Sequence, residues 1–229
     1  MSARRRWRTV LDVKHLNAWW GGAQALFDVS LQVNAGELVV LQGLNGAGKS
    51  TLLQAVMNCG PRVTGAVIYL NEKLDALPAH RRALAGLGYV AEDRRLFANL
   101  TVRENLHIAA RGQVARNQAQ VLQLFPALAP MLSRRASQMS GGEQQMLAIA
   151  RTLMTQPQLL LLDEPCEGIA PVLVESILQA LLVLKTQGMP MLVAEQNQLL
   201  AGRADRVLRL ESGRVVSESK TNQSTQQQT

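Results

Sequence analysis

The sequence predicts an α/β fold that has a mainly parallel sheet, an antiparallel β layer near the N-terminus and an inserted α-helical subdomain. Three observations support this fold class. A short apolar run, a glycine-rich loop and a helical pattern follow one another over residues 37–57. Residues 159–194 read as strand, helix and strand, and residues 96–150 carry helical patterns without convincing strands. Alternating β and α segments are typical of parallel sheets.

The glycine-rich loop has the composition of a phosphate-binding P-loop. Glycines let backbone N–H groups curl around an anion, and the following helix directs its unpaired N–H groups and its dipole at the same anion. The lysine supplies a positive charge, and the serine hydroxyl is placed to bind Mg²⁺. The predicted nucleotide-binding residues of this segment are Gly43, Leu44, Asn45, Gly46, Ala47, Gly48, Lys49, Ser50 and Thr51.

A second anion-binding pattern begins at Ser140. Ser140, Gly141, Gly142 and Glu143 open a predicted helix, and their amides could receive a phosphate. The P-loop already surrounds one side of a nucleotide, so a second anion site implies a second chain.

An acidic pair follows the apolar strand at 159–162. Asp163 lies where parallel strands gather ligands and could hold Mg²⁺, while Glu164 could face the terminal phosphate as general base. The neighbouring negative charges are expected to raise the pKa of Glu164, although Mg²⁺ would oppose that shift. Taken alone, such a pair could equally be a helix cap.

The remaining segments predict the organisation of one domain over 9–217. Near-alternating apolar residues over 22–36 and a run at 65–70 predict the antiparallel layer. Thr101 and Glu104 form a predicted capping box, and 205–216 reads as a closing hairpin. We therefore place the core at about 9–95 and 151–217, and the helical subdomain at about 96–150.

Composition limits the class of protein. The 229 residues are 47% hydrophobic and 18% charged, which is typical of a globular chain, and no run is long enough for a membrane span. A cytoplasmic location is expected.

The net charge of +7 would suit nucleic acid or lipid headgroups, but we interpret the basic residues 1–8 as a solvated tail. Residues 218–229 lack apolar side chains and predict a disordered polar tail.

The order of these motifs resembles that of ATP-binding cassette (ABC) ATPases, over about residues 11–216. The resemblance implies that two cassettes sandwich two ATP molecules, with the P-loop of one chain facing Ser140, Gly142 and Glu143 of the other. It also implies that Trp20, just before a glycine pair, stacks on adenine. Plain packing in the β layer is the alternative role for Trp20.

Two positions depart from the common pattern of that family. Glu92 stands where glutamine is usual, and Gln196 replaces a histidine; both positions sense the terminal phosphate. Gln196 can donate a hydrogen bond to phosphate but cannot titrate near neutral pH, whereas Glu92 could contact Mg²⁺ as a charged ligand. Hydrolysis is then expected to depend mainly on Glu164.

The segments 92–97, 139–147, 164–171 and 194–197 together resemble branched-chain amino-acid importer ATPases, and this chain is similar to the shorter of their two ATPase subunits. The resemblance implies a second ATPase subunit as partner, although homodimers could form in isolation. It also implies two permease subunits, a periplasmic binding protein, and a position at the cytoplasmic face of the bacterial inner membrane.

Three alternatives stay open. Similar cassettes serve urea, short amides and other small polar solutes. Soluble ABC proteins that act on DNA or ribosomes usually add a coiled coil or a second cassette, for which 229 residues leave no room; no nucleic-acid partner is expected. An inactive regulatory cassette would fit the changes at 92 and 196 but not the intact Lys49, Asp163, Glu164 and Ser140.

Overall fold

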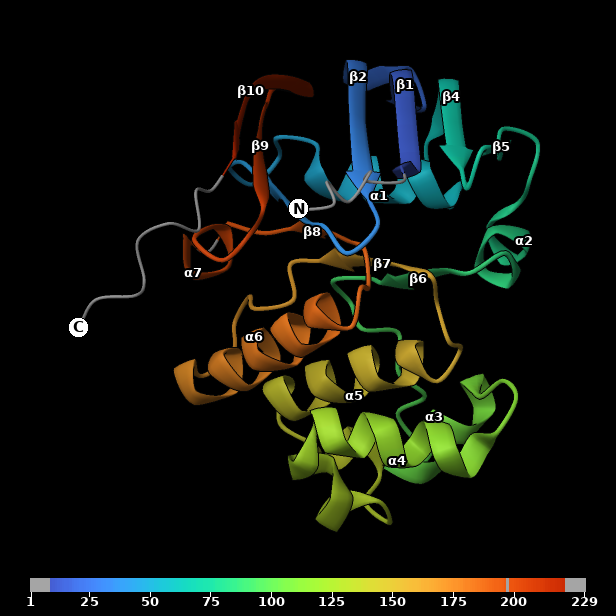
Figure 1. Cartoon of the computed structure of the whole chain (residues 1–229), viewed down its shortest axis with the longest axis vertical. Helices are drawn as coiled ribbons and strands as arrows, with labels where there is room; N and C mark the ends of the chain where they lie inside the picture. Colours follow the sequence, from blue (N-terminus) through green and yellow to red (C-terminus); the bar gives the residue numbers. More distant parts are fainter. Residues whose placement is uncertain (1–8, 197, 221–229) are drawn as a thin grey trace, which may run out of the picture.

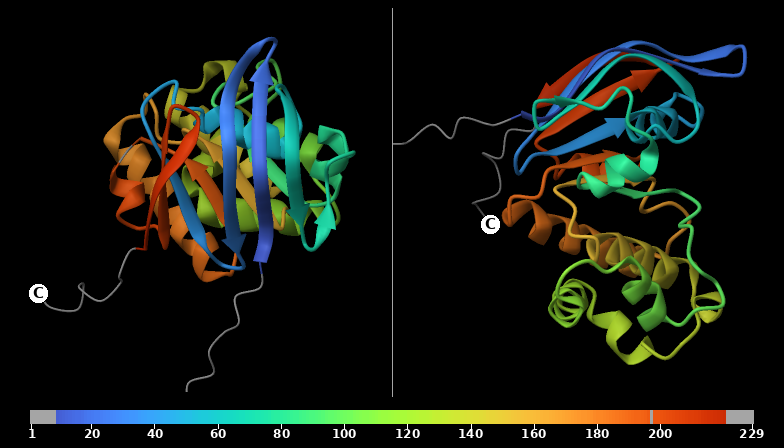
Figure 2. Two further views of the ribbon diagram at one scale, coloured as in Figure 1. Left: turned by 90° about the horizontal axis from the view of Figure 1, so that it is seen from above. Right: turned by 90° about the vertical axis from the view of Figure 1, so that its right-hand side faces the viewer.

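A computed structural model describes residues 9–196 and 198–220. The predicted basic tail at 1–8, the last residue of the 194–197 motif and residues 221–229 lie outside the described part. The described residues form two sheets. Figures 1 and 2 show an antiparallel sheet at one end of the molecule, a mainly parallel sheet in the middle and a layer of helices at the other end.

The antiparallel sheet has the order β2-β1-β4-β5. Its strands are β1 (Thr9–Trp20), β2 (Ala23–Asn34), β4 (Arg62–Tyr69) and β5 (Glu72–Lys73). The sheet confirms the predicted N-terminal β layer. It is separate from the parallel sheet, and helix α1 (Lys49–Met57) lies between the two.

The mainly parallel sheet has the order β10-β9-β3-β8-β7-β6. Among the described strands of this sheet, only β10 runs antiparallel to its neighbour. The strands are β3 (Leu38–Gln42), β6 (Leu87–Val90), β7 (Leu159–Asp163), β8 (Met191–Ala194), β9 (Arg206–Glu211) and β10 (Arg214–Lys220).

The central strands read as uninterrupted apolar runs because both of their faces are buried. In β7, Leu160 and Leu162 pack toward the helical layer, while Leu159 and Leu161 pack toward α1 and the antiparallel sheet. Parallel strands covered on both faces have this composition. The carboxyl ends of β3 and β7 therefore deliver the P-loop and Asp163 to the same edge of the sheet.

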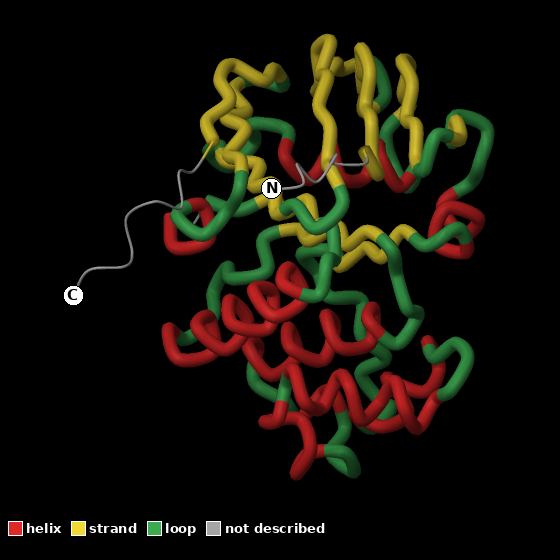
Figure 3. The backbone as a smooth tube through the Cα atoms, viewed as in Figure 1, coloured by secondary structure: helices red, strands yellow, loops and turns green. Residues whose placement is uncertain are grey.

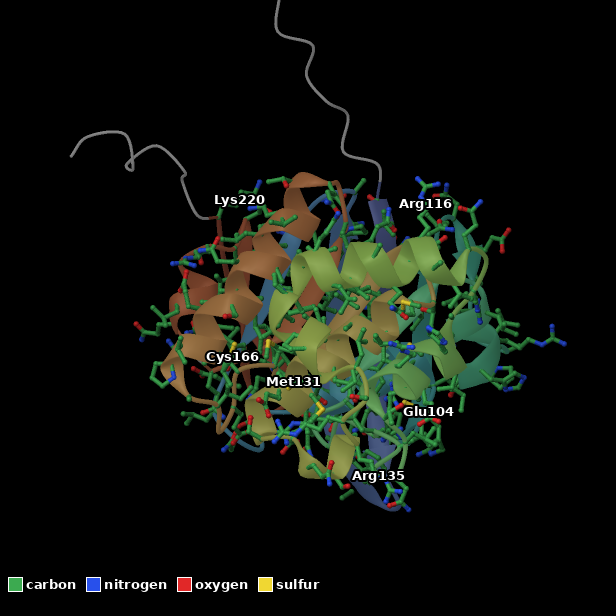
Figure 4. All side chains as sticks on the ribbon, turned by 90° about the horizontal axis from the view of Figure 1, so that it is seen from below. Glu104, Arg116, Met131, Arg135, Cys166 and Lys220 are labelled. Carbon is green, nitrogen blue, oxygen red and sulfur yellow. The ribbon has the colours of Figure 1, made fainter. Side chains whose placement is uncertain are left out.

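The helical layer follows the predicted insertion (Figure 3). It contains α3 (Val102–Ala109), α4 (Val114–Leu124), two 3₁₀ segments (Pro126–Met131 and Ala136–Gln138) and α5 (Gly141–Leu153). The Thr101–Glu104 capping box is confirmed. Arg135 pairs with Thr101 in an isolated β-bridge, and Figure 4 labels Arg135 and Glu104 on this part of the molecule, seen from below.

The remaining helices are α2 (Ala79–Leu84), α6 (Pro171–Thr186) and α7 (Gln198–Ala201). Helix α6 completes the predicted strand–helix–strand unit, because β7 and β8 pair in parallel. In the described part of the chain, no helix is long and apolar enough to cross a membrane.

One boundary was predicted wrongly. Residues 218–220 do not belong to a disordered tail, because they continue β10 and pair with β9 opposite Leu208, Val207 and Arg206. The Arg206 guanidinium donates to Glu218 at 2.7 Å and to Glu37 at 3.1 Å. Main-chain pairing and this ion pair hold a segment that has no apolar side chain of its own.

A buried arginine holds α2 against α1. The Arg82 side chain donates to the carbonyls of Val56 at 2.6 Å, Leu74 at 2.7 Å and Leu77 at 3.0 Å.

Replacing Arg82 with methionine leaves the Val56 and Leu74 carbonyls without this donor. We expect unfolding free energy to fall by roughly 3 kcal/mol, measured by urea denaturation. Arg81→Met, at an exposed position of the same helix, should change it little; equal effects would contradict this role.

Candidate nucleotide site

The loop between β3 and α1 needs its glycines for different reasons. Gly46 and Gly48 have φ values of 79° and 103°, and residues that carry a Cβ rarely adopt such positive φ values. Gly43 has no positive φ, but a Cβ there would lie 2.4 Å from the Leu210 carbonyl oxygen. The prediction that all three glycines make room for phosphate is therefore incomplete, since Gly43 makes room for β9.

Lys49 is the first residue of α1, and its buried side chain reaches back to the loop. Its Nζ donates to the carbonyls of Gly43 at 2.9 Å and Leu44 at 3.1 Å. The same nitrogen lies 3.0 Å from Glu164 Oε1. Lys49 thus reaches across from the P-loop to the residue that follows β7.

Ser50 and Asp163 also meet across the two motifs. The Ser50 hydroxyl donates to Asp163 Oδ1 at 2.8 Å, and the Tyr89 hydroxyl donates to Oδ2 at 3.1 Å. Burial raises the pKa of Asp163, while these hydrogen bonds oppose the shift. A hydroxyl and a carboxylate converging at a helix N-terminus are the oxygen donors that Mg²⁺ prefers.

The expected rise in the pKa of Glu164 is not found. Burial alone would raise it, but hydrogen bonds from Glu167 and Lys49 together with the Lys49 charge outweigh burial and lower the pKa. The shared hydrogen bond instead raises the pKa of Glu167 to about 7. The prediction weighed Asp163, the phosphates and Mg²⁺ but overlooked Lys49 as a direct partner of Glu164. The contact with Lys49 therefore favours the ionised form of Glu164.

A cavity of about 640 Å³ opens over this cluster. It brings together much of the predicted site, because P-loop residues, Glu92 and Glu164 all line it. Gln196 lies beside the same cluster, because its amide donates to Asn45 Oδ1 and a hydrogen bond between Gln196 and Glu164 helps to lower the pKa of Glu164.

Sequence reasoning missed the part of the cavity formed by β2 and the β9–β10 turn. Phe27, Ser212 and Gly213 line it. The Gly213 N–H donates to the Ala47 carbonyl at 2.9 Å, and Phe27 N–H donates to the Gly213 carbonyl at 2.9 Å. Main-chain hydrogen bonds therefore join the β9–β10 turn to both the P-loop and β2. No local motif marks these residues, since they meet the loop only in the folded chain.

Trp20 lies next to the first turn of α1. Its indole Nε1 donates to Thr51 Oγ1 at 3.3 Å. The ring also rests on Gly60, where a Cβ would come within 2.6 Å of it. The side chain remains 47% exposed, so one part of the indole is held while the rest faces solvent.

The Ser140 motif occupies a different place. Ser140 caps α5 and forms a capping box with Glu143, and α5 lies across the parallel sheet from α1 (Figure 1). Among the described residues that line the cavity, none comes from 140–143. A Cβ at Gly142 would lie 2.4 Å from Leu173, so this glycine also permits α5 to pack near α6.

Comparisons with known proteins identify this arrangement. A family model described as ABC transporter matches residues 26–167. The chain belongs to the ABC transporter family. Its fold is that of ABC ATPase cassettes, and the chain is an ATPase of this family.

Individual relatives cover nearly the whole chain. The chain is 42% identical to the high-affinity branched-chain amino acid transport ATP-binding protein BraG of Pseudomonas aeruginosa, covering 90% of this chain and 91% of that protein. It is 34% identical to the probable branched-chain amino acid transport ATP-binding protein LivF of Archaeoglobus fulgidus, with 93% of each covered. The dimeric structure of the bacterial ABC transporter cassette MJ0796 matches with a TM-score of 0.83 and 27% identity, covering 93% of this chain and 99% of that one.

Proposed function

We propose that this chain is the ATP-hydrolysing subunit of an importer for branched-chain amino acids. The paired contacts Lys49–Glu164 and Ser50–Asp163, which join the P-loop to the end of β7, carry the catalytic part of this proposal. The relatives BraG and LivF, named for branched-chain amino-acid transport, support the cargo.

The site residues have separable roles in this proposal. The P-loop amides and Lys49 bind the phosphates, and Trp20 stacks on adenine. Ser50, Asp163 and Glu92 hold Mg²⁺, which would neutralise charge on the phosphates when bound. Phosphate would compete with Glu164 for Lys49. The Glu164 carboxylate would then be free to accept a proton from the attacking water.

A second chain completes the site. Residues 140–143 do not line the cavity of their own chain among the described residues, and the N-terminus of α5 carries amides suited to an anion. We place this end of α5 against the nucleotide of a second ATPase subunit, so that ATP binding closes two cassettes. The closure would be passed to two permease subunits in the bacterial inner membrane, with a periplasmic binding protein delivering solute.

The adenine contact gives a direct prediction. Trp20→Ala removes the aromatic face, and we expect ATP affinity to fall about tenfold, measured by calorimetric titration. Trp20→Tyr should retain most of the affinity because it keeps an aromatic ring. Equal affinity for all three proteins would assign Trp20 to β-layer packing instead.

The cargo is tested by uptake in the native host. We expect deletion of the gene to abolish high-affinity uptake of labelled leucine, isoleucine and valine, and wild-type chain to restore it. The Glu164→Gln chain should not restore it. Normal amino-acid uptake with loss of urea or short-amide uptake would contradict this cargo while leaving the ATPase role intact.

A further inference from the structure

Glu195 is a buried acid next to the nucleotide site, at the carboxyl end of β8. Only 3% of the residue is exposed, and it is not among the described residues that line the cavity. Its main-chain N–H donates to the Leu41 carbonyl of β3 at 3.0 Å, and the Glu164 N–H donates to the Ala194 carbonyl at 2.9 Å. Glu195 therefore lies between the strand that leads into the P-loop and the strand that leads to Glu164.

The Glu195 carboxylate accepts hydrogen bonds from two main-chain groups. Its Oε2 accepts from the Cys166 N–H at 3.1 Å, and its Oε1 accepts from the Gln196 N–H at 2.9 Å. Burial, the charge of Glu195 and a hydrogen bond to its carboxylate raise the pKa of the Cys166 thiol to about 12. The thiol therefore keeps its proton and also donates to this carboxylate. Hydrogen bonds to a charged acceptor are stronger than neutral ones.

The turn that carries Glu164 has a backbone that costs energy. Glu164 has a φ of 45°, a conformation that residues with a side chain rarely adopt. The Glu167 N–H closes the turn on the Glu164 carbonyl at 3.2 Å, and Pro165 has no N–H to donate. The Cys166 N–H lies inside the turn, and a buried N–H needs an acceptor. The Glu195 carboxylate is that acceptor, and so it stabilises the strained turn.

We propose that Glu195 is a positioning residue for Glu164. By binding the Cys166 N–H, its carboxylate holds the turn 164–167 in the conformation that directs Glu164 toward Lys49, 3.0 Å away, and into the cavity. Glu195 touches neither phosphate nor water in this proposal, and it acts only through the turn. The inference rests on the proposed role of Glu164 as the base, and its test separates the two.

The first measurement is ATP hydrolysis by the full chain in single-turnover assays, with ATP affinity from calorimetry. Glu195→Ala should slow hydrolysis by about 10- to 100-fold, because a misplaced base loses its alignment with the attacking water. ATP affinity should stay close to that of the wild type. Glu195→Gln replaces one acceptor oxygen with a donor, and we expect it to slow hydrolysis less, by about threefold.

The Glu164→Gln background shows whether the effect passes through Glu164. Residues that act as a unit are not additive, so Glu195→Ala should not slow the residual hydrolysis of a Glu164→Gln chain any further. A further loss in that background would show that Glu195 acts through another residue, such as Gln196, and would overturn the proposal.

The second measurement reports the turn without nucleotide, when ATP does not draw a second cassette onto the site. Cys59→Ser leaves Cys166 as the only cysteine of the chain, and Cys166 is buried. A thiol reagent should modify Cys166 about tenfold faster when Glu195→Ala is added, because the turn opens more often after this hydrogen bond is lost. An unchanged rate would show that Glu195 does not hold the turn.

Glu37→Gln is the matched control. Glu37 is also a buried acid whose carboxylate accepts a main-chain N–H, from Asn34 at 2.8 Å, but it lies just before β3, at the end remote from the P-loop. Hydrolysis and Cys166 reactivity should match the wild type. Wild-type hydrolysis in both Glu195 variants, or in Glu195→Gln if the alanine chain does not fold, would overturn the positioning role. Wild-type turnover in Glu164→Gln would instead overturn the proposed base.

Discussion

Replacing Glu164 with glutamine should leave ATP bound and slow its hydrolysis by about 10²–10⁴-fold. The glutamine oxygen can still accept a hydrogen bond from Lys49, which lies 3.0 Å from the carboxylate. The amide cannot accept a proton from water, however. Phosphate release in single-turnover assays measures the chemical step, and calorimetry measures binding.

Neutralising a different carboxylate provides the control. Glu175→Gln removes an exposed acid on α6 that pairs with Arg203 at 3.3 Å and does not line the cavity. It should hydrolyse ATP at the wild-type rate. Wild-type turnover in Glu164→Gln would show that another group accepts the proton.

Replacing Lys49 with alanine should weaken ATP binding by at least about 100-fold, since a charged donor to phosphate contributes roughly 3 kcal/mol. The substitution also removes the donor to the Gly43 and Leu44 carbonyls, which lie 2.9 and 3.1 Å from Nζ. The loop thus loses both its charge and its internal support. Equilibrium binding of ATP to the purified chain measures the loss.

Lys185→Ala serves as the comparison because this lysine pairs with Asp205 at 2.8 Å, at the opposite end of the strands from the P-loop. Its ATP affinity should match the wild type. If Lys49→Ala bound ATP as tightly as Lys185→Ala, the phosphate-binding role of the loop would be wrong.

Burial on both faces explains why the central strands were predictable. Runs such as Leu159–Asp163 carry an apolar side chain at nearly every position, and each strand is bounded by a polar or glycine-rich turn. The capping box at Thr101 was also predictable, because its partner Glu104 is only three residues away. Ser140 was predicted only as the start of a helix, and the structure adds its capping box with Glu143. Local chemistry was sufficient for these elements.

The long first strand was not predicted. Residues Thr9–Trp20 carry polar side chains on both sides, and the register shifts near His15, whose φ is 49°. Alternation is lost at such a bulge. The short α2 lacks a periodic pattern, and it is held by the hydrogen bonds of the buried Arg82 and by Ala83, which packs against the core. Pairing with distant segments decides both elements.

In the site, too, local motifs predicted single residues, whereas contacts between distant residues became visible only in the folded chain. Motifs identified Lys49, Ser50, Asp163 and Glu164, but the contact between Lys49 and Glu164 joins residues that only the fold brings together. That contact reverses the expected pKa shift of Glu164. Glu195 could be seen in the sequence, yet its contact with the Cys166 N–H joins two segments that only the fold brings together.

The most direct test of the importer account is to identify what this chain binds in its native host. A tagged Glu164→Gln chain, expressed there and held with Mg-ATP, would be purified from detergent-solubilised membranes and its companions identified by mass spectrometry. The account predicts a second ATPase subunit and two permeases. Recovery of ribosomal proteins or DNA-bound partners, without permeases, would contradict it.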